Sequence, residues 1–332
     1  MFGILSLFIE LVISKFLFFY DVAYLQATII SFVLGLLAAF FLNVRFNFHI
    51  TPAKRKKALL YFSLISSISF SIQHLLRTSI QQYGYDMDTS RFVIAGSFFI
   101  ISYLLHRKLS FREYKKVGVA IYADGVEDIK LIFNKISNIC DFIHIDIVDK
   151  TYNLECKDVK AYRAEVVRAY WKNKKIEVHI MSKNPSLWLD DLLPYVDVIF
   201  LHPTIDENLS EVIDKINLSN VKAGIALSIY EPLEIIDSYI ENNKVKHVLL
   251  LTIPQPGFSG QKFDVSALPI LEKLNAHKNR SEFEICVDGG VNDSTVKYLN
   301  VESVVSGSYI LSAPNPIKNI MHLQTSGEYA QY

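Results

Sequence analysis

Cysteine is scarce in this chain, and neither sign of charge predominates. The 332 residues include three cysteines, Cys140, Cys156 and Cys286. Their wide, odd spacing excludes a disulfide framework and a Cys-x-x-Cys zinc site. We therefore expect the three cysteines to be small buried hydrophobic residues of a protein in a reducing compartment. Lysine and arginine together number 34, as do aspartate and glutamate, and the formal net charge is zero. The chain therefore has no overall attraction for nucleic acids or anionic lipids.

Four apolar runs occupy the first third of the chain. The first is no signal peptide, because Glu10 and Lys15 interrupt it and no small-residue cleavage site follows. Roughly 17–25 helical residues cross a hydrocarbon core of about 30 Å, and four such runs in so short a stretch are unusual for a soluble bundle. We therefore predict an all-α transmembrane domain of four helices over residues 1–112. The runs are Phe2–Tyr20, Leu25–Leu42, Ala58–Leu76 and Phe92–Leu105.

Basic residues are unevenly distributed among the loops between these runs. The loop after the second run and the stretch after the fourth are rich in lysine and arginine, whereas the first loop has none. Basic loops stay on the cytoplasmic side, and four spans return the chain to the side where it started. We therefore predict a multi-pass membrane protein with both termini and the rest of the chain in the cytoplasm. The basic residues are Arg45, Lys54, Arg55, Lys56 and Lys57, and then Arg107, Lys108, Arg112, Lys115 and Lys116.

The second and fourth runs end in similar octapeptides, residues 41–48 (FLNVRFNF) and 104–111 (LLHRKLSF). Each has a polar residue, then a base and an aromatic residue, as expected where a helix leaves a bilayer. Together with four spans of this size, this region resembles the GtrA-like family of small membrane proteins. The resemblance implies a role in cell-surface polysaccharide synthesis, with a polyprenyl-phosphate sugar as a partner.

After residue 116, short β-branched runs alternate with amphipathic stretches. Strands that alternate with helices indicate parallel pairing, and eight such units fit a closed barrel. We predict an α/β fold, a (β/α)8 TIM barrel, over residues 117–325; a doubly wound open sheet, with its ligand at one switch point, is the alternative. The predicted strands are Val117–Ala123, Phe142–Val148, Ile176–Met181, Val196–His202, Val221–Ile229, His247–Ile253, Phe283–Val287 and Ser303–Ser306. The predicted helices include Val126–Ile136, Val159–Trp171, Asn208–Lys215, Pro232–Tyr239 and Val265–Leu274.

Several of these strands end in ionisable residues. The second carries His144 and Asp146, which share one face, the third His179, the fourth His202 and the seventh Asp288. A single residue of this kind is more often structural, but in a barrel all these strand ends meet at one mouth. Two imidazoles and two carboxylates would be costly to bury unpaired, whereas one divalent cation pairs with all four. Such ligands suit Zn²⁺, Fe²⁺, Mn²⁺ or Co²⁺, and the sequence does not choose among them.

Glycine-rich loops follow the sixth, seventh and eighth predicted strands. Glycine lets backbone N–H groups approach an anion closely, and a phosphate site after strands seven and eight is common in barrels. We therefore predict that these loops bind a phosphate group. The candidate residues are Gly257, Ser259, Gly260, Gly289, Gly290, Gly307 and Ser308.

Six segments resemble ribulose-phosphate 3-epimerase in order and spacing. They are residues 144–149 (HIDIVD), 178–181 (VHIM), 223–227 (AGIAL), 256–263 (PGFSGQKF), 287–290 (VDGG) and 305–308 (VSGS). The resemblance implies an isomerase that inverts C3 of a ketose phosphate, as from D-ribulose 5-phosphate to D-xylulose 5-phosphate. It makes Asp146 and Asp288 the acid/base pair and metal ligands, with His144 and His179 as the other ligands. Met181 and His202 then belong to the substrate site, Met181 as part of a methionine cap.

The substrate-contacting shell departs from the family pattern. Lys150 replaces a glycine, Ser228 a lysine and Gln255 an acidic residue, while Val148 and Thr252 stand where two further methionines are usual. The first strand also lacks the family's serine. These departures concern the identity of the sugar more than the type of reaction.

The predicted function is therefore a metal-dependent ketose-phosphate 3-epimerase tethered to the membrane and linked to polysaccharide synthesis. The alternative is a non-catalytic phosphosugar-binding barrel that regulates a GtrA-like polyprenyl-sugar translocase. Retention of both Asp146 and Asp288 favours the enzyme, because a sensor has little need of two acids. A third hypothesis makes transport the main activity and the barrel a scaffold. Expected partners are the ketose phosphate and membrane lipid, with self-association left open and no nucleic acid.

Overall fold

The structure is a computed structural model, and it places the chain in two compact units. The first comprises Met1–Ile50 and Lys54–Glu113, and the main segment of the second is Tyr114–Tyr332. The residues that the structure describes are 2–46, 55–81, 83–84, 87–110, 114–121, 128–155, 162–258 and 260–329. Cys156 and Ser259, both singled out from the sequence, lie outside the described residues.

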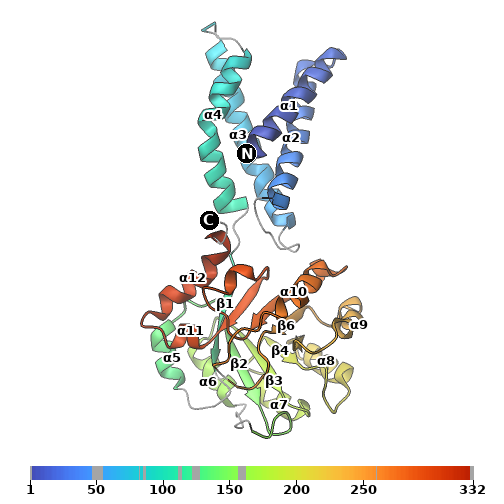
Figure 1. Ribbon diagram of the computed structural model, residues 1–332, viewed down its shortest axis with the longest axis vertical. Helices are drawn as coiled ribbons and strands as arrows, with labels where there is room; N and C mark the ends of the chain where they lie inside the picture. Colours follow the sequence, from blue (N-terminus) through green and yellow to red (C-terminus); the bar gives the residue numbers. More distant parts are fainter. Residues whose placement is uncertain are drawn as a thin grey trace. The chain divides into compact units, whose positions relative to one another are not determined.

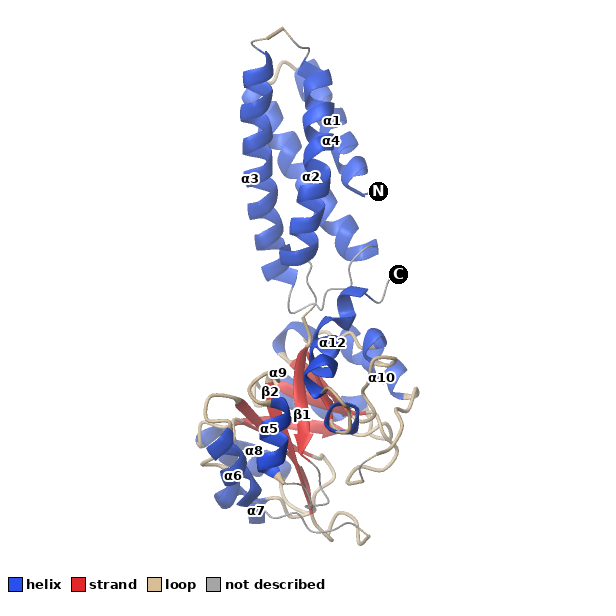
Figure 2. Ribbon diagram, turned by 90° about the vertical axis from the view of Figure 1, so that its left-hand side faces the viewer, coloured by secondary structure: helices blue, strands red, loops and turns tan. Residues whose placement is uncertain are grey.

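Long helices make up the first unit. Helix α1 (Phe2–Phe19) packs along α2 (Tyr24–Phe46), and α3 (Arg55–Gln81) packs along α4 (Met87–Leu105), as Figure 1 and Figure 2 show. A π-helical turn, η2 (His106–Ser110), continues α4. All four predicted apolar runs are therefore helical.

The surface of these helices is apolar. Phe19, Leu25 and Phe41 are 80%, 65% and 65% exposed, whereas Ser14 and Ser31 are buried. A soluble protein rarely exposes so much contiguous apolar surface, but a bilayer solvates it. The arrangement is that of a membrane domain, with its large apolar side chains outward and small polar ones between helices.

The number of spans differs from the sequence prediction. Among the described residues, two helices rather than four are long and apolar enough to cross a bilayer, Tyr24–Phe46 and Arg55–Ile80. The apolar part of α4 is shorter, Gly96–Leu105, because the helix begins with polar residues that include Asp88. The prediction of four membrane-spanning helices is thus supported for two of them.

The second unit is a closed barrel of eight parallel strands in sequential order, with β1 paired to β8. This confirms the predicted TIM-barrel architecture and excludes the open sheet. The strands are β1 (Lys116–Ile121), β2 (Phe142–Val148), β3 (Lys175–Met181), β4 (Val198–Leu201), β5 (Lys222–Leu227), β6 (His247–Leu251), β7 (Glu284–Asp288) and β8 (Ser303–Ser306).

Helices surround the barrel, and their boundaries depart most from the prediction. The predicted helix Pro232–Tyr239 is a 3₁₀ turn followed by one short α-helix, and α7, α11 and α12 have no counterpart among the helix ranges named from the sequence. The α-helices are α5 (Ile129–Ile136), α6 (Tyr162–Tyr170), α7 (Ser186–Leu192), α8 (Leu209–Leu218), α9 (Asp237–Glu241), α10 (Ala267–Ala276), α11 (Ser308–Leu311) and α12 (Pro316–Tyr329). The 3₁₀ turns are η3 (Leu233–Ile236), η4 (Arg280–Glu282) and η5 (Val296–Tyr298).

Strand alternation divides the barrel into two cores. On β2, Ile143 and Ile145 join the core between strands and helices, whereas Phe142 joins the core inside the barrel. His144 and Asp146 follow Phe142 at intervals of two, so they share its inward face. Gly118 makes room for the Phe142 ring, because a Cβ there would lie 2.2 Å from it. The packing of the barrel interior thus directs the polar end of β2 into the mouth.

Candidate active site and metal centre

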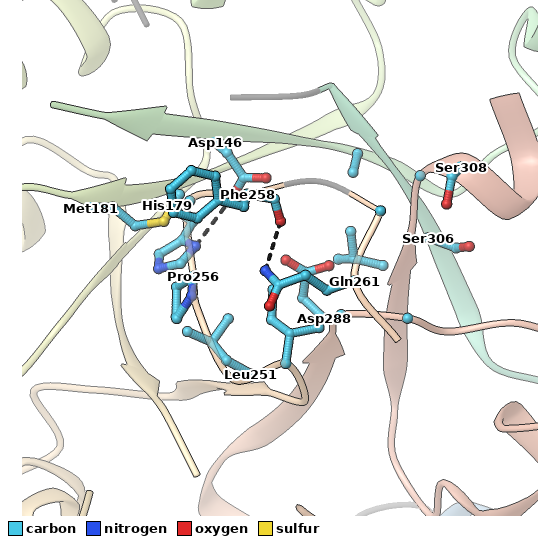
Figure 3. A pocket seen from close by; sticks show the side chains of 18 residues that line it. Asp146, His179, Met181, Leu251, Pro256, Phe258, Gln261, Asp288, Ser306 and Ser308 are labelled. Carbon is cyan, nitrogen blue, oxygen red and sulfur yellow. Dashed lines mark hydrogen bonds and ion pairs between the residues drawn. The ribbon is translucent and has the colours of Figure 1, made fainter. Parts of the chain in front are cut away.

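Three strand ends converge at the barrel mouth. One ligand atom from each of four side chains lies within 4.8 Å of the others, and Figure 3 shows three of these side chains on one pocket. Nε2 of His144 is 3.5 Å from Oδ1 of Asp146 and 4.0 Å from Oδ2 of Asp288. Nδ1 of His179 is 3.2 Å from the same Oδ1 of Asp146. We call this set the His/Asp cluster: His144, Asp146, His179 and Asp288.

Burial and mutual charge interactions shift the pKa values of the residues in this cluster. Burial would raise the pKa of Asp146, but His144 and His179 hold it well below its usual range. Burial, together with the charge of Asp146, raises the pKa of Asp288. Burial would lower the pKa of His144, but the carboxylates around it raise it to about 10. These carboxylates therefore create a strong demand for positive charge at the barrel mouth.

A divalent metal ion fits this demand. Both ring nitrogens of His144 are buried without a hydrogen-bond partner in the structure, which is costly unless another group binds them. Imidazole nitrogens and carboxylate oxygens are the donors that Zn²⁺, Fe²⁺, Mn²⁺ and Co²⁺ accept. A cation among the four atoms would bind Nε2 of His144 and offset the charge of both aspartates.

Further charged groups lie behind His144 on β3. Oε2 of Glu177 is 3.7 Å from Nδ1 of His144, and Lys175 contacts the other Glu177 oxygen at 2.6 Å. A carboxylate behind a ligand histidine favours protonation of the rear nitrogen and directs the front nitrogen to the metal. Neither residue was predicted from the sequence. Alternation on β3 could have found them, since Lys175 and Glu177 share the face of His179.

His202, predicted to contact substrate, lies elsewhere. It is buried behind His179, with its Nε2 2.9 Å from Nε2 of His179, and it does not line the pocket of the described residues. Its ring packs 4.9 Å from the ring of Tyr152. His202 therefore reaches the cluster through His179.

Glycine-lined loops form the other wall of the pocket. Gly257, Gly260, Gly289 and Gly290 all adopt positive φ. At Gly290 a Cβ would lie 2.3 Å from the backbone N of Phe263, so that only glycine lets the two loops approach. Of the phosphate residues predicted from the sequence, all except the undescribed Ser259 line the pocket. They are Gly257, Gly260, Gly289, Gly290, Gly307 and Ser308.

The side chain of Gln261 braces the loop after β6. Its Nε2 donates to the carbonyl oxygens of Gln255 and Phe258, and its Oε1 accepts from the backbone N–H of Gln255. Figure 3 shows Gln261 beside Asp288 and Phe258 near Asp146 and His179, all on the same pocket. The loop is therefore closed on itself before any ligand binds.

Only part of the expected methionine cap has a counterpart. Met181 lines the pocket, as Figure 3 shows, whereas Val148 is buried and absent from the lining. Thr252 turns away from the pocket: its Oγ1 donates to the carbonyl oxygens of Asp288 and Gly289. Thr252 therefore braces the end of β7, a role that its sequence position does not reveal.

These features define a (β/α)8 barrel with a histidine–carboxylate centre facing a glycine-lined pocket wall. The sequence model of the ribulose-phosphate 3 epimerase family matches residues 118–311, which is more than half of the chain. The chain therefore belongs to that family, and its barrel is an isomerase of the epimerase class. The model of the GtrA/DPMS transmembrane domain matches residues 1–111.

Two characterised relatives illustrate the match. The cytoplasmic isoform of ribulose-phosphate 3-epimerase from Oryza sativa subsp. japonica is 31% identical over 203 residues, covering 58% of this chain and 84% of its own. Ribulose-phosphate 3-epimerase from Bacillus subtilis is 28% identical over 193 residues, covering 56% of this chain and 87% of its own.

Solved structures share the fold at low identity. The 3-hexulose-6-phosphate synthase of Salmonella typhimurium superposes with a TM-score of 0.50 at 15% identity, over 65% of this chain and 100% of that one. A crystal structure of KGPDC from Streptococcus mutans gives the same TM-score and identity over 66% of this chain and 99% of that one. At this identity the likeness shows the fold alone.

Proposed function

We propose that the barrel inverts C3 of a ketose phosphate, D-ribulose 5-phosphate or a close relative, with the help of a divalent metal ion. The observation that carries the proposal is the meeting of Asp146 and Asp288 at one pocket, although β2 and β7 are separated by two other strands. Two acids at one carbon are what epimerisation needs without a redox cofactor.

The proposed reaction uses these acids as base and acid. C3 of a 2-ketose lies next to the C2 carbonyl, so one carboxylate can remove the C3 proton and leave an enediolate. The other carboxyl group returns a proton to the opposite face, which inverts C3. A divalent ion held by the His/Asp cluster would supply Lewis-acid stabilisation of the negative charge on the substrate oxygens.

The glycine-lined wall would hold the far end of the substrate. Backbone N–H groups of the loops after β6, β7 and β8 can bind a phosphate, and Gly289 and Gly290 let these loops come close together. Binding energy from this remote group would fix C3 between the two carboxylates.

A substrate panel tests this proposal. The full chain in detergent, supplied with Zn²⁺, Fe²⁺, Mn²⁺ or Co²⁺, should exchange the C3 proton of ribulose 5-phosphate or a related ketose phosphate with solvent and invert C3. Chelation should abolish the exchange, and restoring the metal should recover it. Metal bound without turnover of any ketose phosphate would favour the non-catalytic, regulatory alternative.

The membrane domain motivates a second part of the proposal. We infer that four helices cross the bilayer, that the barrel lies in the cytoplasm, and that the barrel supplies or removes a sugar phosphate for surface polysaccharide synthesis. The basic loops and the GtrA/DPMS match support this. Protease should digest the barrel in inside-out vesicles and spare it in intact cells. Labelled-lipid transport by the full chain would test a polyprenyl-phosphate sugar as partner.

A further inference from the structure

A line of four polar side chains runs outward from the His/Asp cluster. Asp146 Oδ1 is 3.2 Å from His179 Nδ1, and His179 Nε2 is 2.9 Å from His202 Nε2. His202 Nδ1 is in turn 4.0 Å from Oε1 of Glu231, in the loop after β5. Both histidines are about 1% exposed. The line thus has a carboxylate at each end and two buried imidazoles between.

Three contacts in this line compete for two N–H protons when both imidazoles are neutral. Two are at hydrogen-bond distance, Asp146 to His179 and His179 to His202, and the third is the longer 4.0 Å approach of Glu231 to His202, which also favours a proton between the two groups. Wherever the protons sit, one gap brings a lone pair against another lone pair. A cation in the Asp146–His179 gap removes this conflict, and that gap lies inside the His/Asp cluster.

The outer carboxylate decides how the remaining protons are placed. Glu231 faces Nδ1 of His202 and favours a proton there, which leaves Nε2 of His202 as an acceptor. The contact at 2.9 Å then requires His179 to donate from Nε2. His179 consequently keeps the lone pair of Nδ1 free on the side of Asp146.

Neighbouring groups hold this line of side chains, which we call the relay (Asp146, His179, His202 and Glu231), in place. The other oxygen of Glu231, Oε2, accepts from the backbone N–H of Ser228 at 2.6 Å. The ring of Tyr152 packs against that of His202. The contact with Ser228 fixes the carboxylate of Glu231 beside His202.

We propose that His202 and Glu231 are positioning residues that present Nδ1 of His179 to the metal ion, and that His202 does not contact the sugar. The proposal rests on the proposed metal-dependent function and adds two residues to it. It also assigns the ligand atoms: His179 binds through Nδ1, and His144, whose Nδ1 faces Glu177, binds through Nε2.

Metal titration tests the relay on the full chain in detergent. Apo protein is titrated with Co²⁺, followed by its visible absorption, and with Zn²⁺ in competition with a chelator. His202→Phe should weaken binding by about 10- to 100-fold, the usual effect of losing such an outer partner. Glu231→Gln should weaken it less, and His202→Gln, whose amide oxygen can still accept from His179, should retain most of the affinity. His277→Gln is the matched control, since His277 makes a comparable 2.8 Å contact with Asp237 outside the site.

Two further measurements separate positioning from general damage. Thermal unfolding of the metal-free variants should match that of metal-free wild type. Imidazole ¹⁵N spectra of the Zn²⁺-loaded chain should show a protonated Nε2 on His179. Wild-type affinity, within about twofold, in both His202→Phe and Glu231→Gln would overturn the relay, as would coordination through Nε2 of His179. If wild type itself binds neither ion, the relay and the metal-dependent function both fail; if it binds and turns over while the variants are unchanged, only the relay fails.

Discussion

The carboxyl groups of Asp146 and Asp288 share one cluster but are driven in opposite directions. Two histidines hold the pKa of Asp146 down, while burial and the charge of Asp146 raise the pKa of Asp288. A pair of acids whose environments separate their proton affinities is typical of acid/base catalysis. The same chain matches the epimerase family over residues 118–311 and the GtrA/DPMS transmembrane domain over residues 1–111.

Asp288→Asn should abolish epimerisation while leaving phosphate binding largely intact. The amide cannot exchange a proton with C3, and loss of one general acid/base costs about 100- to 10,000-fold in rate. The measurements are kcat for the ketose phosphate and, by calorimetry, the affinity for inorganic phosphate. Asp293→Asn, at an exposed aspartate of the next turn, is the control and should keep its rate. Full activity in Asp288→Asn would remove Asp288 from the mechanism.

Gly290→Ala should damage the anion pocket more than Gly260→Ala. Both glycines have positive φ, so alanine at either costs about 1–2 kcal/mol of stability. At Gly290 the new methyl group would also lie 2.3 Å from the backbone N of Phe263, whereas nothing lies within 4 Å at Gly260. We expect a larger rise in KM and a lower unfolding midpoint for Gly290→Ala. Equal effects of the two substitutions would contradict the close approach of the loops.

The stability of the chain should depend on His247 between about pH 6.5 and 4. Burial, reinforced by Lys175, lowers the pKa of His247 from 6.5 to about 4, despite nearby Glu177 and Glu284. As the pH falls, His247 therefore takes up a proton in the unfolded chain before it does so in the folded chain. The stability that the folded chain gains from neutral His247 is complete above about pH 6.5 and is lost as the pH falls toward 4.

The comparison is between wild type and His247→Gln, by chemical unfolding at a series of pH values. Over this range wild type should lose about 1–3 kcal/mol more of its unfolding free energy than the variant, given 1.36 kcal/mol per pKa unit. Parallel pH curves for the two proteins would show that His247 titrates normally.

Two of the three thiols should be unreactive in the folded chain. Burial raises the pKa of Cys140 to about 12 and that of Cys286 well above its usual range, so neither forms a thiolate near pH 8. A chromogenic disulfide reagent should leave both unmodified until the chain is denatured. A Cys156→Ser variant lacks the remaining thiol, so in its folded state it should not react with the reagent. Rapid native labelling of that variant would disprove the burial of Cys140 and Cys286.

Much of the fold followed from local sequence pattern. β-Branched runs set the strands, and the predicted bounds of β2 and β8 agree with the structure, because both contain isoleucine or valine residues that favour a strand. Helix ends were predicted less well. The 3₁₀ turn η3 replaced part of a predicted helix, and α7, whose cap makes no side-chain hydrogen bond, gave little local signal.

The sequence by itself determined that the four residues of the His/Asp cluster come together at the barrel mouth. Alternation put His144 and Asp146 on one face, and barrel closure brings strand ends to one side, so the His/Asp cluster follows from period and topology. Only the tertiary structure decided what each side chain meets there. Thr252 bonds to the end of β7, and Glu231 reaches His202 from an irregular loop, because loop paths and rotamers depend on contacts between residues remote in sequence.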